Sequence, residues 1–294
     1  MALGAPSELY VTMDQTTPDP VVRAWRESAP FWEKHRETVR TMFHPITTAL
    51  LDAARIAAGQ SVLDVAAGPG EPSLTIAERV GRAGRVLSTD VTAGMLAAGL
   101  REARRRGLEN IAFCACSGTA LPLRSHCRDA VVCRLGVMFF PDPLAGLTEM
   151  LRVLRPGARL ALAVWPPRET SPFMSIPNEV VARHCGAAPP EDPDAPSALR
   201  FAEPGKLARL LARAGARGVT EETVDFRIAA PIPLEEFWPM RSELSEMLRG
   251  KLAQMPPALV ARIAADATEA ARPYFATGRM DFPAQIRIVS GEKA

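Results

Sequence analysis

The stretch Val62-Leu-Asp-Val-Ala-Ala-Gly-Pro-Gly-Glu-Pro-Ser-Leu74 combines a buried strand, an acid within it, a glycine turn and the start of a helix. The strand, Ser61 to Val65, is rich in β-branched and apolar residues, which suits a parallel strand covered on both faces. Gly68 and Gly70 let the backbone turn sharply and approach a ligand without a Cβ in the way. The stretch therefore predicts a nucleotide-binding corner in an open α/β sheet.

Two carboxylates, Asp64 and Glu71, flank this glycine turn. A dinucleotide fingerprint aims bare backbone N–H groups at a pyrophosphate, which two carboxylates would repel. A ligand that carries an ammonium and a sulfonium group and no phosphate would be attracted instead, and S-adenosylmethionine (SAM) is such a ligand. The carboxylates and the lack of a third helix-opening glycine also argue against a nicotinamide-dependent oxidoreductase.

The motif from Asp64 to Gly70 resembles the first motif of the class I SAM-dependent methyltransferases. It is most similar to the branch of the ubiquinone/menaquinone-biosynthesis methyltransferases and of small-molecule methyltransferases often labelled type 11. The resemblance is strong from Leu50 to Trp165 and weak elsewhere. It implies a Rossmann-like fold with SAM as the methyl donor. It also implies cofactor contacts from Asp64, Ala66, Ala67, Gly68 and Gly70.

The second strand, Arg85 to Asp90, ends in an acid where an open parallel sheet delivers residues that face a ligand. A carboxylate there can accept both ribose hydroxyls in charge-assisted hydrogen bonds. The resemblance gives Asp90 this role and places Val91 and Met95 beside the adenine. The alternative is that Asp90 only caps the next helix.

The third strand, Asn110 to Cys116, leads into Cys116-Ser-Gly-Thr-Ala-Leu-Pro122, which looks like the family segment Gly-Asp-Ala-x-x-Leu-Pro. Ser117 then stands where the family has an adenine-binding aspartate, and Gly118 follows it. A serine hydroxyl can accept a hydrogen bond from the adenine amino group, but it lacks the charge and the reach of an aspartate.

The fourth strand, Asp129 to Leu135, is the second strong match. Because its end lies beside the first strand in the family fold, the resemblance places three residues near the methionine part of the cofactor: Arg134, Leu135 and Val137. The pair Phe139-Phe140 that follows is interpreted as core packing in preference to a substrate contact.

The predicted architecture is an open, mostly parallel sheet of seven strands with helices on both faces. Residues 1–57 are expected to form an N-terminal helical lid. Residues 58–229 and 284–294 are expected to form the SAM-binding core. Residues 230–283 are expected to form an inserted helical cap over the carboxyl edge of the sheet, made of one helix from Leu234 to Gly250 and another from Pro256 to Tyr274. A Pro-, Ala- and Asp-rich surface loop is expected from Ala187 to Ala198.

Aromatic side chains in the lid and the cap are candidate walls of an acceptor pocket. The lid candidates are Trp32 and Arg36 on a helical stretch from Val21 to Arg40, and the cap candidates are Phe237 and Trp238. Such residues would suit an apolar or aromatic small-molecule acceptor. Docking of the helices on the sheet explains the same residues equally well.

Composition excludes several other classes. With 35 basic and 33 acidic residues and a net charge of +2, no overall field favours nucleic acid, and no aromatic RNA-binding motif is present. No stretch reaches the ~18 to 20 apolar residues that span a bilayer, and no signal-peptide core is found, so a cytoplasmic protein is expected. Five cysteines without a pairing framework suggest reduced thiols.

Cysteine chemistry is a further alternative, because an arsenic methyltransferase on this fold would hold its substrate with cysteines. Cys114 and Cys116 share one face of a strand, but the chain has no Cys-x-x-Cys. Core cysteines are therefore favoured and no metal is expected.

The expected reaction is transfer of the sulfonium methyl group to a small-molecule acceptor, mainly by proximity and alignment. Where the acceptor must lose a proton, a histidine could serve as the base. The sequence does not fix which one, and the candidates are His35, His44, His126 and His184. The alternative function is a protein that binds SAM or S-adenosylhomocysteine without catalysis, as a sensor or partner subunit.

Overall fold

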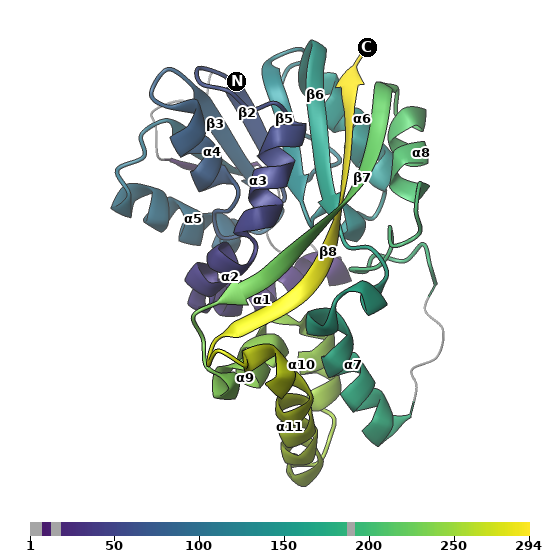
Figure 1. The fold of residues 1–294 in the computed structure, drawn as a ribbon. Coiled ribbons are helices and arrows are strands. Elements are labelled where there is room, and N and C mark those ends of the chain that lie inside the picture. The colour runs from purple at the N-terminus through teal and green to yellow at the C-terminus, as the bar shows by residue number, and fades with distance from the viewer. Residues whose placement is uncertain (1–7, 13–18, 187–191) are drawn as a thin grey trace.

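A single sheet of eight strands forms the centre of the described chain in the computed structural model, which describes residues 8–12, 19–186 and 192–294 (Figure 1). The strands run in the spatial order β1-β4-β3-β2-β5-β6-β8-β7. Their bounds are β1 Leu9–Val11, β2 Ser61–Val65, β3 Arg85–Asp90, β4 Ile111–Ala115, β5 Arg128–Arg134, β6 Leu154–Val164, β7 Ala216–Ala230 and β8 Met280–Lys293.

The strand count of seven predicted from the sequence is wrong by one, and the extra strand is β1. It adds to the edge of the sheet parallel to β4, with Leu9 opposite Phe113 and Val11 opposite Ala115. Three residues are too few to show an alternating pattern, so only the pairing with β4 defines this strand. The predicted fold class itself is confirmed.

The order of the strands creates the crevice in which a ligand can bind. All strand pairs are parallel except those made by β8, which runs antiparallel to both β6 and β7. The chain moves outward from β2 to β3 and β4 and then returns to the other side of β2 with β5. The carboxyl ends of β2 and β5 therefore flank the topological switch point, where open α/β sheets bind ligands.

Helices cover both faces of the sheet. Helices α3, α4 and α5 pack on one face, and α6 and α8 pack on the other (Figure 1). The helices are α1 Pro20–Lys34, α2 Arg36–Met42, α3 His44–Ala53, α4 Ser73–Val80, α5 Ala93–Arg105, α6 Pro143–Val153, α7 Pro172–Cys185, α8 Lys206–Arg213, α9 Leu234–Leu244, α10 Glu246–Leu252 and α11 Pro257–Ala271. Burial on both faces explains why β2 reads as a nearly continuous apolar run.

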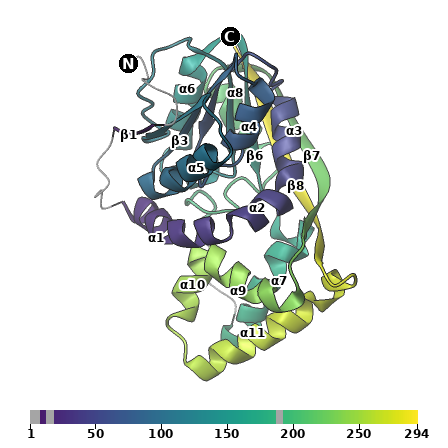
Figure 2. The same ribbon diagram turned by 90° about the vertical axis from the view of Figure 1, so that its left-hand side faces the viewer.

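A second group of helices, α7, α9, α10 and α11, lies beyond the carboxyl ends of the strands, and α1 and α2 lie between this group and the sheet (Figure 2). The long ribbon of β7 and β8 extends from the sheet to the same group (Figure 1). Of the two helices predicted in residues 230–283, the first is divided into α9 and α10 at Ser245, and the second matches α11.

Helix α7 was not anticipated from the sequence. Pro172 stands in its first turn and Pro177 lies inside it, so the proline content concealed a helix that has a buried face. The predicted helix from Val21 to Arg40 is likewise divided into α1 and α2 at His35. Part of the predicted loop from Ala187 to Ala198, residues 187–191, lies outside the described residues. No helix in the described part of the chain is long and apolar enough to cross a membrane.

Candidate functional site

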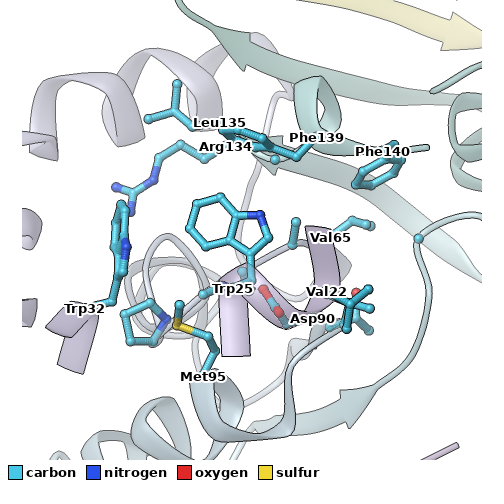
Figure 3. Close-up of a pocket in the computed structure, with 18 of the residues that line it drawn as sticks. Val22, Trp25, Trp32, Val65, Asp90, Met95, Arg134, Leu135, Phe139 and Phe140 are labelled. Atoms are coloured by element: carbon cyan, nitrogen blue, oxygen red, sulfur yellow. Dashed lines mark hydrogen bonds between the residues drawn. The ribbon is translucent and has the colours of Figure 1, made fainter. Parts of the chain in front are cut away.

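A cavity of about 380 Å³ lies at the carboxyl ends of β2, β3, β4 and β5, with α1 and α2 as its opposite wall (Figure 3). This volume falls within the usual range of small-molecule sites. The wall from α1 and α2 contributes residues at helical spacing, and the strand ends contribute loops. The cavity therefore joins segments that are more than a hundred residues apart in the sequence.

Two strained backbone positions mark the edge of this cavity. Ala66 follows β2 with φ of 58°, and Leu135 follows β5 with φ of 60°, although neither is a glycine. Such conformations cost free energy in an L-residue and persist where the surrounding structure fixes them, commonly at ligand sites. Both residues line the cavity. The chain therefore leaves each of the two strands that flank the switch point through a residue with a positive φ angle.

The glycine loop after β2 is held close to helix α5. Gly70 has φ of 125°, and a Cβ built on it would lie 2.8 Å from Leu74 Cδ1 and 3.2 Å from Gly99 Cα. A side chain at this position would therefore push the loop away from α5 and into the cavity. The loop geometry predicted from the sequence depends on this close approach.

Asp90 connects the end of β3 to the glycine loop. Its Oδ2 accepts a hydrogen bond from the Gly68 N–H at 3.0 Å, and its Oδ1 accepts from the Thr92 N–H at 2.8 Å. Thr92 is itself the N-cap residue of α5, so this bond orders the entry of the helix without capping its first turn. Loss of surrounding water raises the pKa of Asp90 to about 6, against the opposing effect of the backbone donors.

Asp64 lies behind the loop and is not among the lining residues. Ser73 Oγ donates to its Oδ2 at 2.6 Å, while Oδ1 has no hydrogen-bond partner within the described parts of the chain. Burial raises the pKa of Asp64 to about 7, although the Ser73 hydroxyl and the charge of Arg134 act in the opposite direction. Asp64 therefore ties β2 to α4, and the cofactor contact expected from the sequence stays a prediction.

Arg134 is a cation without a carboxylate partner among the residues that the structure describes. Its Nη1 donates to Thr47 Oγ1 at 2.9 Å, and its Nη2 donates to the carbonyl oxygen of Glu71 at 2.8 Å. Burial lowers its pKa, while the charges of Glu71 and Asp64 act in the opposite direction. The guanidinium lines the cavity at the junction of β5, α3 and the glycine loop.

Ser117 is occupied by its own turn. Its Oγ lies 2.8 Å from Thr119 Oγ1 and accepts from the Thr119 N–H at 3.2 Å. Gly118 beside it packs against Phe140, because a Cβ there would lie 2.5 Å from Phe140 Cζ. Both predicted residues line the cavity, and Thr119 joins them.

The structure brings together most of the residues that the sequence predicted as cofactor contacts. Those that line the cavity are Ala66, Ala67, Gly68, Asp90, Val91, Met95, Ser117, Gly118, Arg134 and Leu135. Three others are buried and do not line it: Asp64, Gly70 and Val137. These three residues lie behind the loops that line the cavity.

The aromatic wall of the cavity was only partly predicted. Trp32 and Arg36 line it as expected, but so do Trp25, Phe139 and Phe140. Figure 3 shows the Trp25 indole in the middle of the site, with its ring centroid 6.0 Å from that of Trp32 and 5.0 Å from that of Phe139. Phe139 and Phe140 are therefore wall residues as well as packing residues.

Other wall residues were missed although the sequence contains a usable signal. A stripe at helical spacing faces the cavity from α1, α2 and the residue that joins α2 to α3: Val22, Trp25, Trp32, Arg36, Val39 and Phe43. Spacings of three, four and seven residues mark one helix face.

Phe237 and Trp238 of α9 do not line the cavity. Phe237 is fully buried in an aromatic cluster, 6.1 Å from Phe173 and 5.3 Å from Phe282 between ring centroids, and Trp238 is also buried. Phe237 thus belongs to a core that joins α9 to α7 and β8, and the role of both residues in a substrate lid stays a prediction.

The lining contains none of the four histidines. His35 Nε2 lies 2.5 Å from Glu243 Oε2, and His184 Nε2 lies 2.8 Å from Asp266 Oδ2. His44 is exposed at the start of α3, and His126 is exposed just before β5, at the amino ends of the strands. That one of these four histidines acts as a general base stays a prediction, and the cavity lining does not support it.

The strand order and the glycine loop together define a class I methyltransferase fold. The resemblance inferred from the sequence is confirmed for the central part of the chain, because residues 43–183 match the model of the ubiE/COQ5 methyltransferase family.

Individual relatives agree with this assignment. The demethylmenaquinone methyltransferase of Beutenbergia cavernae is 38% identical over 128 residues, which are 44% of this chain and 50% of that relative. The uncharacterized protein Rv1405c of Mycobacterium tuberculosis is 37% identical over 121 residues, 41% of this chain and 43% of that relative. The chain thus matches about half the length or less of these curated relatives.

Among solved structures, phosphoethanolamine N-methyltransferase 2 of Haemonchus contortus, solved with phosphomonomethylethanolamine and S-adenosylhomocysteine, superposes with a TM-score of 0.54. The superposition covers 90% of this chain and 60% of the Haemonchus contortus chain, at 14% sequence identity. At this identity the likeness shows the fold alone.

Proposed function

We propose that this protein is a SAM-dependent methyltransferase that acts on a small apolar or aromatic acceptor. The observation that carries the proposal is the hydrogen bond between Asp90 and the Gly68 N–H, which joins the ends of β2 and β3 in one cavity. A carboxylate beside a glycine loop at the switch point suits a nucleoside that offers ribose hydroxyls and no phosphate.

The residues along the cavity fit the parts of SAM in order. Asp90 would accept the ribose hydroxyls, and Val91 and Met95 would pack on the adenine. Ser117 would accept from the adenine amino group once its hydroxyl turns from Thr119. The strained backbone at Ala66 and Leu135 supports this assignment, because two strand ends are already shaped for a ligand.

Arg134 is assigned to the carboxylate of the methionine part. A half-buried guanidinium without a carboxylate partner in the described chain carries a desolvation cost that a bound carboxylate would offset. Arginine also suits a planar carboxylate, to which it can donate two parallel hydrogen bonds. The charge of Arg134 would then balance the acidic side of the loop, where Glu71 lies.

Catalysis would depend on alignment and on exclusion of water. When bound, SAM supplies a sulfonium methyl group for in-line transfer to a nucleophile. Trp25, Trp32 and Phe139 would hold a planar acceptor against the donor and keep water out, and such positioning accounts for a large part of many rate enhancements. Because no histidine lines the cavity, this proposal assigns no general base.

The first test compares SAM with decarboxylated SAM, which lacks only the methionine carboxylate, by calorimetric titration. For Arg134→Gln we expect SAM affinity to fall about tenfold or more, roughly 1.4 kcal/mol, while the affinity for decarboxylated SAM changes little. The control is Arg155→Gln, an exposed arginine at the start of β6 that pairs with Asp129 and does not line the cavity. Equal losses for both ligands would contradict the assignment of Arg134.

A second test separates transfer from mere binding. The wild-type protein is incubated with SAM and a panel of phenols and hydroquinones, and S-adenosylhomocysteine is measured by mass spectrometry. Acceptor-dependent formation of S-adenosylhomocysteine supports the enzyme. Tight SAM binding without product for any acceptor favours the non-catalytic binding protein, which the absence of a histidine in the lining also permits.

A further inference from the structure

The turn after β4 places two hydroxyl groups in the cavity beside the end of β3. The Cys116 N–H donates to the Asp90 carbonyl oxygen at 2.9 Å, and the chain continues from this pairing directly into Ser117. Ser117 and Thr119 are half-buried, and both line the cavity. A nucleoside whose ribose meets Asp90 would therefore present its base to these two hydroxyls.

The two hydroxyls bond to each other, and the direction of that bond is reversible. Ser117 Oγ and Thr119 Oγ1 lie 2.8 Å apart, and either can be the donor. Ser117 Oγ also accepts from the Thr119 N–H at 3.2 Å. A hydroxyl has one O–H donor and two acceptor lone pairs. In either direction, the pair therefore keeps one O–H donor and at least one acceptor position for a ligand.

An aspartate at position 117 would offer a different set of groups, because an ionised carboxylate only accepts. It would favour the amino group of adenine and repel the keto oxygen of hypoxanthine. The hydroxyl pair suits both bases. It can accept from the adenine amino group while it donates to the ring nitrogen N1, or it can donate to the hypoxanthine keto oxygen while it accepts from the N1–H.

Two uncharged side chains adjoin the turn. The hydrogen bond with Cys114 and burial raise the pKa of the Cys116 thiol, so this thiol stays neutral. A Cβ built on Gly118 would lie 2.5 Å from Phe140 Cζ, so the Phe140 ring covers that side of the turn. Hydrogen bonds formed beside such neighbours are stronger than they would be in open water.

The acids that line the cavity are engaged with other groups. Asp19 accepts from the Val21 N–H at 2.8 Å at the start of α1. Glu71 Oε2 accepts from the Thr75 hydroxyl at 2.6 Å, and Asp90 holds the glycine loop. The choice between an amino and a keto group on the base thus falls to the hydroxyl pair.

We propose that Ser117 and Thr119 make the base subsite indifferent to the purine edge, so that the cavity binds S-inosyl as well as S-adenosyl compounds. The inference rests on the proposed function, because it names the class of nucleoside that the same cavity accepts. Hypoxanthine differs from adenine only at this edge. The contacts proposed for Asp90 with the ribose and for Arg134 with the carboxylate are therefore the same for both compounds, and the ratio of the two affinities reports on the edge alone.

The test compares S-adenosylhomocysteine with S-inosylhomocysteine by calorimetric titration of the full chain. We expect wild type to bind both compounds with affinities within about fivefold of each other. Ser117→Asp should raise the preference for S-adenosylhomocysteine by about tenfold or more, chiefly through weaker binding of S-inosylhomocysteine, because a carboxylate then faces the keto oxygen. Ser117→Asn has the same shape, but its amide both donates and accepts, so it should keep the wild-type ratio.

Ser125→Asp is the matched control, because Ser125 is an exposed serine before β5 that does not line the cavity. It should also keep the wild-type ratio. Thermal unfolding checks the fold of each variant, and an aspartate at position 117 can still accept from the Thr119 N–H. If Ser117→Asp fails to fold, the wild-type ratio decides alone.

Three results overturn the proposal. The first is a wild-type preference for S-adenosylhomocysteine greater than about fivefold. The second is the same ratio in wild type and Ser117→Asp. The third is an equal rise in Ser117→Asn and Ser117→Asp, since shape and not hydrogen-bonding character would then govern the choice.

Failure of this inference is distinguishable from failure of the proposed function. Binding of S-adenosylhomocysteine without binding of S-inosylhomocysteine removes the indifferent base subsite and leaves the methyltransferase. No binding of SAM or S-adenosylhomocysteine removes the proposed function, and the inference with it.

Discussion

At the scale of single residues, Asp90 is the side chain on which the proposed cofactor site depends most. It orders the glycine loop through Gly68 and the entry of α5 through Thr92, and it remains at the cavity surface. A carboxylate accepts hydrogen bonds best when it is ionised. Its raised pKa of about 6 therefore makes ligand binding depend on pH.

We expect SAM affinity to rise as the pH increases from 5 to 7 and to level off above. The sign follows from the raised pKa, because below about pH 6 the folded protein holds a proton on Asp90 that must leave before both ribose hydroxyls can be accepted. Calorimetry at several pH values measures this dependence. In Asp90→Asn the affinity should be lower throughout and the rise should be diminished. A wild-type affinity independent of pH would contradict the role of Asp90.

Residue identities at strand ends could be predicted from the sequence, whereas the direction of individual side chains could not. Asp90 and Ser117 follow recognisable strands, so their places in the cavity are as predicted. Asp64 lies within a strand, and the pleat turns it toward Ser73 and away from the ligand side. His35 joins α1 to α2, the two helices of the wall, but the turn there directs it to Glu243.

At the scale of elements, the loop after β5 must pack closely on the loop after β2. A Cβ built on Gly136 would lie 2.4 Å from Ala66 Cβ and 3.0 Å from Cys133 Sγ. Ala66 already has a strained backbone, so it has little freedom to move. The two loops that flank the switch point thus form one unit.

Gly136→Ala should therefore lower stability and SAM affinity together. We expect a loss of about 1–3 kcal/mol in the free energy of unfolding, the usual cost of overpacking a buried site. Gly250→Ala in α10 is the matched control, because no atom lies within 4 Å of its added Cβ, and it should be neutral or stabilise by up to about 1 kcal/mol. Urea denaturation measures both. Equal effects of the two substitutions would show that the loops are not tightly coupled.

Helix α1 is held between the sheet and the helices α9 and α10 by charged contacts. Lys34 Nζ lies 2.7 Å from Glu243 Oε1 of α9, and the guanidinium of Arg249 in α10 stands 4.7 Å from the Phe31 ring. Since α1 also forms one wall of the cavity, its release would open the site. The contacts with α9 and α10 are thus expected to govern ligand escape.

Glu243→Gln should speed SAM dissociation about two- to fivefold with little change in melting temperature. The change weakens a partly exposed charged contact, whose worth is about 1 kcal/mol or less. Stopped-flow displacement of bound SAM by S-adenosylhomocysteine measures the rate. Glu269→Gln, which removes an exposed pair with Arg272 away from the cavity, is the control and should leave the rate unchanged. The same rate in wild type and Glu243→Gln would show that this contact does not hold the wall in place.

At the scale of the whole molecule, the central sheet follows from local patterns, but the arrangement of the outer helices does not. Strands β2 to β6 and their turns are encoded by short apolar runs, glycines and prolines. The contact between Trp165 and Phe43, or between Phe237 and Phe282, joins residues that are distant in the sequence. No local signal distinguishes an aromatic residue in such a contact from one in a ligand wall, which is why the sequence leaves both interpretations of Phe237 and Trp238 open.

The central claim is that the cavity between the sheet and α1 binds SAM, and calorimetric titration with SAM and with S-adenosylhomocysteine tests it most directly. We expect wild type to bind both ligands at micromolar strength. Asp90→Ala should lose about tenfold or more in affinity, roughly 1.4 kcal/mol, while Asp225→Ala, an exposed change on β7, should bind as wild type does. No binding of either ligand by wild type, or equal affinities for wild type and Asp90→Ala, would contradict it.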